Sequence, residues 1–173
     1  RYQREFEKQS AQHGLDWRLL AAISYQESHW DQNAISPTGV QGLMMLTQDT
    51  AKLMGVKNRT LPKDSIQGGT AYFKQILSKL PASVQEPDRT WMALAAYNMG
   101  PGHMIAARKL TRKVQGDPNS WLDVSRNLMT LAQHNRANGK PAPDVKQALH
   151  YVQQVRRYYD AIALNHDAER DQQ

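Results

Sequence analysis

The sequence predicts an all-α fold. Helical periodicity, with apolar residues recurring at three- and four-residue intervals, runs through most of the chain. Alternating segments rich in Val, Ile and Thr, which are typical of strands, are missing. A chain of 173 residues can bury a hydrophobic core without a metal or a disulfide, and this one has no cysteine. We therefore expect one helical domain over residues 1–173, with room for a small lobe.

The first quarter of the chain predicts two helices and a structured loop. Residues 2–13 form an amphipathic pattern that ends at Gly14. Asp16 is placed to cap a second helix that runs to about His29. Residues 30–42 are interrupted by a proline and two glycines, so we expect a loop that follows directly on the second helix.

Two further helices are predicted before residue 81. Thr47 can cap a short helix that runs through Met54 and is closed by Gly55. Asp64 can cap a longer helix, and Pro81 would stop it.

The second half of the chain shows the same pattern of helices and breaks. Helix signals cover 88–98, break at Gly100-Pro101-Gly102 and resume to about Val114. Another helix is expected over 121–133.

The last quarter of the chain predicts a loop followed by one long helix. Residues 134–143 hold two asparagines, a glycine and two prolines, so we expect a flexible loop there. Asp144 then caps the last helix, and beyond Asn165 the polar tail is expected to fray.

Composition and charge narrow the class of protein. A mean hydropathy of −0.71 and the absence of a long apolar run argue against a transmembrane segment. The chain begins at Arg1 without an initiator Met or a leader, so we expect a piece of a longer protein. The net charge of +6 favours a polyanionic partner such as nucleic acid, an anionic membrane surface or an acidic cell wall. The densest basic cluster, at 108–113, also fits a solvated helix face.

Glu27 is the most informative single residue. Leu20, Ile23 and Glu27 share one stripe of the predicted second helix, which places a carboxylate in line with the core. Burial in apolar surroundings raises the pKa of a carboxyl group, as a general acid requires near neutral pH. The alternative is a Glu27 at the solvent edge, paired with Arg18 or a later basic residue. Periodicity leaves both readings open.

The residues around Glu27 form a long and specific signature. Glu27-Ser28-His29-Trp30 is followed by Ala34, Ser36 and Gly39 and then by Gly42-Leu43-Met44. This spacing resembles the signature of the lytic transglycosylases that share the goose-type lysozyme-like fold.

Two further blocks resemble the same family. Residues 95–102, Ala-Ala-Tyr-Asn-Met-Gly-Pro-Gly, are similar to its Ala-Tyr-Asn-x-Gly-x-Gly element, and Tyr151-Val152 with Val155 and Tyr158-Tyr159 is similar to its late Tyr-Val helix. The three blocks extend from about Trp17 to Tyr159. The resemblance implies a lysozyme-like helical domain with a substrate groove.

The resemblance also assigns roles to individual residues. It implies that Glu27 is the catalytic acid and that the hydroxyl of Tyr151 orients the carboxyl group. Tyr151 alone would otherwise be read as a core aromatic residue. The substrate-binding residues it implies are Ser36, Gly42, Met44, Met45, Tyr97 and Asn98. Turn formation at Ser36 and Gly42, core packing of the methionines and a simple helix end at Asn98 remain alternatives.

The sequence departs from the commonest family pattern at three positions. Met45 and Gln48 stand where the family usually has Gln and Pro, and Val40 replaces a usual Ala. The Met-Met-Leu-Thr variant resembles the membrane-bound lytic murein transglycosylase F branch. That resemblance implies a preceding regulatory domain like a periplasmic solute-binding protein, and a location on the periplasmic side at the outer membrane.

The resemblance implies a reaction with one catalytic carboxylate. Glu27 would protonate the oxygen between MurNAc and GlcNAc and then, as base, help the MurNAc C6 hydroxyl attack its own C1. The partner would be peptidoglycan glycan strands and the product a 1,6-anhydroMurNAc end. Because the nucleophile belongs to the substrate, no second carboxylate has to hold a water molecule.

Three other functions stay open at this point. A hydrolytic muramidase would use Asp31 or Asp49 to activate water. A noncatalytic peptidoglycan-binding module would keep the groove without turnover, which the combination of Glu27, Tyr151 and Asn98 disfavours. A nucleic-acid binder would want a basic recognition helix that the sequence lacks, so we expect no nucleic-acid partner. No cofactor or metal is expected, because the six His residues lack paired ligand spacing.

Overall fold

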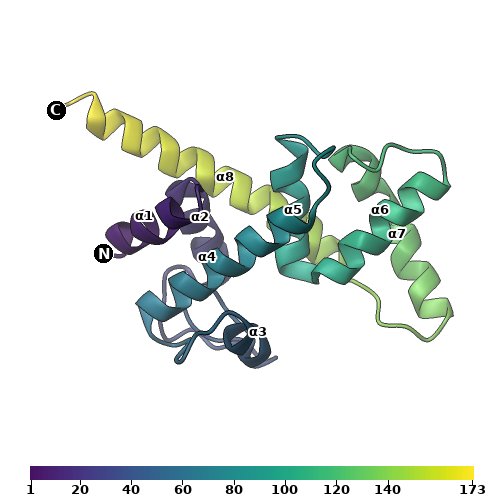
Figure 1. Ribbon diagram of the computed structural model, residues 1–173, viewed down its shortest axis with the longest axis horizontal. Helices are drawn as coiled ribbons and strands as arrows, with labels where there is room; N and C mark the ends of the chain where they lie inside the picture. The colour runs from purple at the N-terminus through teal and green to yellow at the C-terminus, as the bar shows by residue number, and fades with distance from the viewer. The chain divides into compact units, whose positions relative to one another are not determined.

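The computed structural model describes residues 1–173 and contains eight helices without a sheet (Figure 1). The only strand-like pairing consists of isolated bridges from Gln41 to Ile35 and to Leu46. The predicted all-α class is therefore confirmed. None of the helices combines the length and apolar character needed to cross a membrane.

The chain divides into two compact units. The first unit comprises Arg1–Lys74 and Gln154–Gln173, and the second comprises Gln75–Gln153. Because α4 and α8 each contribute to both, the units are not consecutive segments of sequence. Their helices are α1 (Gln3–Gln12), α2 (Trp17–Ser28), α3 (Gln48–Leu53), α4 (Pro62–Lys79), α5 (Asp88–Met99), α6 (Pro101–Lys113), α7 (Trp121–Ala137) and α8 (Val145–Arg170).

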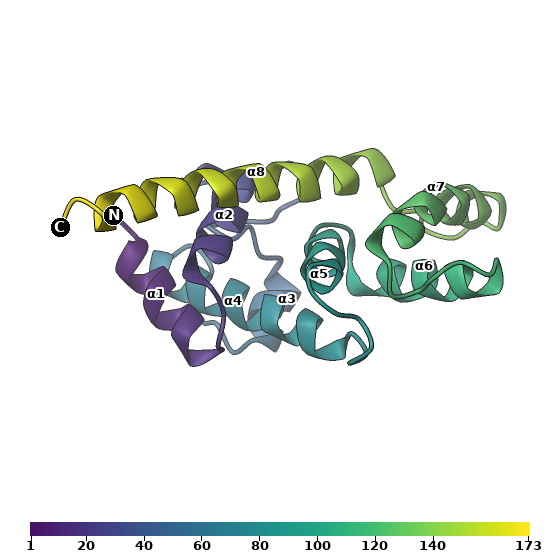
Figure 2. The same ribbon diagram turned by 90° about the horizontal axis from the view of Figure 1, so that it is seen from above.

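The first unit is built around the apolar face of α2. Figures 1 and 2 show α1 beside α2, and the two helices are in contact. Leu20 and Ile23 of α2 are fully buried. The same core contains Phe6, Leu43, Met44, Ile66 and Phe73. The predicted apolar stripe of the second helix is therefore its core-facing side.

The second unit packs α5, α6 and α7 against one another (Figure 2). Five consecutive residues of α5, from Met92 to Ala96, are buried. A helix that is apolar on every side belongs inside a protein, so α5 forms the centre of this unit. The other buried residues of the second unit include Val84, Met104, Val124 and Leu128.

Three predicted helix caps are present. The Asp16 carboxylate accepts a hydrogen bond from the Arg18 backbone N–H, and the Thr47 hydroxyl accepts one from the Thr50 N–H. The carboxylate of Asp144 accepts one from the Gln147 N–H at 3.1 Å. Each cap satisfies a backbone donor that the first turn of its helix leaves without a partner.

Two predicted helix starts were wrong. In both cases the helix begins at a proline that lies before the predicted start. α4 begins at Pro62, so Asp64 lies in its first turn and is not the cap. The break predicted at Gly100-Pro101-Gly102 is confined to Gly100, and α6 already begins at Pro101. Proline suits a first helical position because its φ is fixed at a helical value and its missing N–H has no role there.

The predicted loop at 134–143 was also too long. α7 continues to Ala137, and the side-chain amide of Asn138 donates to the His134 carbonyl at 2.8 Å. That bond satisfies a carbonyl at the helix end, so the helix persists until Gly139 and Pro141 follow.

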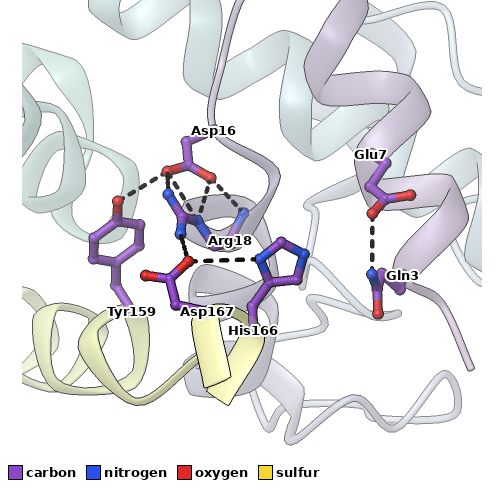
Figure 3. Close-up of polar contacts among 7 residues, drawn as sticks. All are labelled: Gln3, Glu7, Asp16, Arg18, Tyr159, His166 and Asp167. Atoms are coloured by element: carbon purple, nitrogen blue, oxygen red, sulfur yellow. Dashed lines mark hydrogen bonds and ion pairs between the residues drawn. The ribbon is translucent and has the colours of Figure 1, made fainter. Parts of the chain in front are cut away.

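The tail beyond Asn165 does not fray where we predicted, since α8 is helical to Arg170. Polar contacts hold its last turns to the first turn of α2 (Figure 3). A carboxylate oxygen of Asp167 lies 3.7 Å from the Arg18 guanidinium, and Tyr159 donates to the Asp16 carboxylate at 2.8 Å. These partners lie more than a hundred residues apart in sequence, so no local pattern could reveal them.

Asp16 joins the cap of α2 to this cluster. Burial works to raise its pKa, but hydrogen bonds from Arg18 and Tyr159 favour the carboxylate and hold the pKa below its usual value. Burial and the bond to Asp16 raise the pKa of the Tyr159 hydroxyl. The cluster therefore stabilises the fold with Asp16 charged and Tyr159 neutral.

We expect Asp16→Ala to lower the free energy of unfolding by roughly 0.5–2 kcal/mol at neutral pH, the usual range for a lost N-cap. Because the folded pKa of Asp16 is lowered, its stabilising effect is present above the unfolded pKa of about 3.9 and is lost as pH falls through the folded value. Chemical denaturation of the parent and the variant at neutral pH and near pH 3 measures this difference.

The difference in stability between parent and Asp16→Ala should shrink at the lower pH. Asp171→Ala, which removes an exposed carboxylate beyond the end of α8, serves as the control. A constant difference across this range would contradict the role assigned to the charged form of Asp16.

Candidate functional site

Glu27 lies in the last turn of α2 and is half-buried. Two residues on, the backbone of His29 takes a left-handed conformation with φ of 51°, and Trp30 follows with φ of 59°. These consecutive left-handed residues end the helix immediately after the carboxylate. Glu27 is therefore held on a regular helix and still lies beside a sharp change in chain direction.

Two serines join this helix to the loop that carries the Gly-Leu-Met motif. The hydroxyls of Ser24 and Ser28 each donate to the Leu43 carbonyl at 2.8 Å, and both side chains are buried. Leu43 itself is fully buried. One carbonyl thus accepts two side-chain hydrogen bonds and fixes the position of the loop against the turn that bears Glu27.

The other side of the loop is held by α4. The Met44 backbone N–H donates to the Ser65 hydroxyl at 3.0 Å. A methyl group added at Gly69 would lie 2.6 Å from the Met44 side chain, and one at Gly68 would lie 2.9 Å from Leu46. The two glycines therefore allow α4 to approach the loop more closely than any other residue would.

Gly42 has a steric role in this loop. Its φ is 86°, and a methyl group there would lie 2.1 Å from the Arg59 carbonyl oxygen. Only glycine fits both the backbone conformation and the available space. This observation supports the reading of Gly42 as a structural residue.

The two methionines differ in their surroundings. The Met44 side chain is fully buried, the situation of a core methionine, whereas Met45 is half-exposed in a left-handed conformation with φ of 49°. Of the pair, Met45 has the side chain that a ligand could reach.

Ser36 is occupied within its own loop. Its hydroxyl contacts the Thr38 hydroxyl at 2.9 Å and accepts hydrogen bonds from the backbone N–H groups of Thr38 and Val40. Such bonds are typical of a turn-forming serine. The turn alternative thus accounts for its contacts in the structure.

Tyr97, Asn98 and Tyr151 belong to the second unit, whereas Glu27 and the loop belong to the first. Tyr97 and Asn98 are half-buried in the last turn of α5, and Tyr151 is 3% exposed near the start of α8. The side-chain oxygen of Asn98 is buried and accepts no hydrogen bond within the protein. A buried amide oxygen in this state can accept a donor from a ligand.

The carboxylates considered for a second catalytic role lie at the surface. Asp31 is exposed and accepts a hydrogen bond from the Asn33 backbone N–H at 2.9 Å, and Asp49 is exposed in the first turn of α3. Both positions have ordinary structural explanations. No group of three or more His, Asp or Glu side chains is arranged to hold a metal ion.

Comparison with known proteins decides the family. Residues 4–120 match the family described as the Transglycosylase SLT domain, which is more than half of the chain. The chain belongs to this family. The SLT match includes Glu27, the Gly-Leu-Met loop and Asn98, and it ends before Tyr151.

Two relatives of this SLT domain share one name. Membrane-bound lytic murein transglycosylase F of Stutzerimonas stutzeri is 50% identical over 171 residues, which is 94% of this chain and 34% of the relative. The protein of that name from Actinobacillus pleuropneumoniae serotype 5b is 46% identical over 175 residues, which is 100% of this chain and 36% of the relative. The chain thus spans about a third of the length of the curated relatives it matches.

Solved structures confirm the predicted fold. The lytic transglycosylase Slt of Pseudomonas aeruginosa aligns with a TM-score of 0.69 at 22% identity over 95% of this chain and 24% of that one. The 70 kDa soluble lytic transglycosylase of Escherichia coli aligns with a TM-score of 0.60 at 22% identity, over 93% and 24%. The SLT domain therefore has the helical fold of these proteins.

Sequence reasoning missed the residues that hold the loop in place. Ser24 and Ser65 bond to backbone groups 19 and 21 residues away, so their sequence neighbours give no signal. The pair Gly68-Gly69 did give a sequence signal, because adjacent glycines inside an otherwise helical pattern often mark a close approach of two segments.

We expect Gly42→Ala to destabilise the SLT domain more than Gly39→Ala does. Both glycines have φ of 86°, so either change costs about 1 kcal/mol or more in backbone strain. Only at Gly42 does the new methyl group overlap a backbone oxygen, which should add roughly 1–3 kcal/mol. Thermal and chemical denaturation of the two variants measures the difference.

Gly39 is the matched control because no atom lies within 4 Å of a methyl group added there. Equal losses of stability in the two variants would show that Gly42 is required only for its backbone conformation.

Proposed function

We propose that this SLT domain cleaves the β-1,4 bond between MurNAc and GlcNAc in peptidoglycan without water. The proposal rests on Glu27, a half-buried carboxylic acid at the end of α2 beside a loop fixed by Ser24 and Ser28. The family membership supports the class of reaction, since the relatives are named lytic murein transglycosylases. Membrane association and a preceding regulatory domain belong to the same proposal for the full-length protein.

Glu27 acts in two steps. Its protonated carboxyl group donates the proton to the bridging oxygen as the bond from that oxygen to C1 of MurNAc breaks. The resulting carboxylate then takes the proton of the C6 hydroxyl as its oxygen attacks C1. The carboxyl group is restored, and the product is a 1,6-anhydroMurNAc end.

The chemistry of the substrate explains why one carboxylate suffices. The attacking hydroxyl belongs to the sugar that is cleaved, so it is already close to C1 and needs no positioned water. Asp31 and Asp49 are then left with their structural roles. Asn98 would accept a hydrogen bond from the substrate through its buried side-chain oxygen.

We expect Glu27→Gln to abolish cleavage while the fold remains intact. The amide has nearly the shape of the carboxyl group but cannot transfer the proton, which typically costs 10²-fold or more in rate. Digestion of purified peptidoglycan, with mass spectrometry of the products, measures both rate and chemistry.

Mass also distinguishes the reaction from hydrolysis. The parent domain should release fragments that are lighter by one water than hydrolytic fragments and that have no new reducing ends. Hydrated products would instead assign a muramidase. Full activity of Glu27→Gln would remove Glu27 from the mechanism.

We expect Tyr151→Phe to reduce the rate of cleavage substantially. The change removes only a hydroxyl group and keeps the buried ring, so the fold should persist. The family resemblance implies that this hydroxyl supports the catalytic carboxyl group. Initial rates with the same peptidoglycan, together with unfolding curves, separate an effect on catalysis from one on folding.

Tyr159→Phe is the matched control, since its hydroxyl bonds to Asp16 and has no assigned part in the reaction. An unchanged rate for Tyr151→Phe would leave Tyr151 as a structural residue.

A further inference from the structure

The first unit contains a cavity that the proposed reaction does not use. It measures about 450 Å³ and lies where the start of α1, the middle of α2 and the end of α8 meet. This volume falls within the range of about 300–1,000 Å³ typical of small-molecule sites. Its aromatic lining consists of Tyr2, Phe6, Trp17 and Trp30.

This cavity lies on a different side of α2 from Glu27. Ala21 and Trp17 of α2 line it, and Glu27 follows them by six and ten residues. At 3.6 residues per turn, Ala21 lies about 120° and Trp17 about 80° from Glu27 around the helix axis. A ligand in the cavity would therefore face another surface of the helix than the one from which Glu27 projects.

Trp30 is held at the rim of the cavity as an exposed ring. Its indole N–H donates to the Ala21 carbonyl at 2.9 Å, and its ring centroid lies 4.8 Å from that of Tyr25. The side chain is nevertheless 40% exposed, and two left-handed residues, His29 and Trp30 itself, are needed to place it. Strained backbone of this kind collects at functional sites.

The polar lining offers both donors and acceptors. Asn165 and Gln3 carry amides, and the Gln3 nitrogen already donates to Glu7, which leaves its oxygen as an acceptor (Figure 3). Glu169 adds a carboxylate, and His166 adds an imidazole whose ring stands edge-on to Trp17 at 5.4 Å.

This combination fits a saccharide. Each sugar hydroxyl both donates and accepts hydrogen bonds, and the C–H face of a pyranose ring packs on an aromatic ring. The charges of Arg1 and Glu169 are opposite, so the lining shows no excess of positive charge that would select a phosphate.

We propose that the cavity is a second saccharide-binding site, which holds part of a glycan strand away from the catalytic residue. The inference rests on the proposed function for the identity of the glycan. A second contact makes rebinding of the strand intramolecular, which raises the effective concentration of substrate for the domain. The site would therefore matter most on the insoluble wall and little on short soluble fragments.

The test measures binding of the 173-residue chain to purified peptidoglycan by co-sedimentation. Glu27→Gln is the parent, so that the wall is not degraded. Asn165→Ala with Glu169→Ala removes one amide and one carboxylate from the polar lining of the cavity, and both residues are exposed on α8. Gln153→Ala with Asp160→Ala is the matched control, because it also removes one amide and one carboxylate from exposed positions of α8.

We expect the cavity variant to bind the wall roughly tenfold more weakly than the parent, as the loss of two hydrogen bonds predicts, and the control to match the parent. Equal binding by the cavity variant and the control would overturn the proposal. The same comparison on glycan strands freed of their stem peptides identifies the ligand. If the difference vanishes there, the cavity binds peptide and the saccharide assignment is wrong.

A direct measurement does not depend on the wall. Titration of the parent with a soluble chito-oligosaccharide should shift the NMR signal of the Trp30 indole N–H, assigned through Trp30→Phe, and should not shift it in the cavity variant. An unmoved signal in the parent counts against the site.

Cleavage assays keep the two proposals separate. With the catalytic Glu27 restored, the cavity variant should cut short soluble glycan fragments at the rate of the unmodified chain. If the unmodified chain releases no anhydro product but the cavity variant still loses binding, the proposed reaction fails and the second site stands.

Discussion

The geometry around Glu27 depends on a single carbonyl group. The Leu43 carbonyl is buried in the first unit and accepts hydrogen bonds from Ser24 and Ser28. An unsatisfied buried carbonyl would cost about 1–3 kcal/mol, so the loop is strongly constrained to the position in which both bonds form. The helix α2 and the Gly-Leu-Met loop are thereby one structural element, although 15 residues separate Ser28 from Leu43.

The family signature contains residues with different physical tasks. Gly42 and Ser28 shape and hold the loop, and Met44 fills the core beneath it. Glu27 is the residue to which we assign the proton transfer in the proposed reaction. Some residues of the signature therefore support the structure around Glu27 and need not contact the substrate.

The sequence predicted interactions between residues close in the chain better than interactions between distant ones. Caps at Asp16, Thr47 and Asp144 were predicted, because a cap joins residues two or three positions apart. The position of Glu27 at the end of α2 was predicted for a similar reason, since helical periodicity is local, and its catalytic role stays a prediction. The acceptor shared by Ser24 and Ser28 could not be predicted, because hydrogen bonds over 15 or more residues leave no local pattern.

Helix ends were predicted less well than helix caps. Asp64 was read as a cap and Pro101 as part of a break, although α4 begins at Pro62 and α6 at Pro101, because proline can end a helix or begin one and the next residues do not decide between these roles. The end of α8 was placed too early because its last turns are held by Arg18, at the opposite end of the sequence. Distant partners of this kind decide whether a polar segment stays helical.

The carboxylate of Asp16 caps α2 and also accepts a hydrogen bond from the hydroxyl of Tyr159 in α8. The first turn of one helix and the late turns of another therefore share one anchoring group. Local opening of either segment breaks contacts that hold the other, so the two should exchange their backbone amide protons together as one cooperative unit. The earliest and latest parts of the chain would then behave as a single element in the native ensemble.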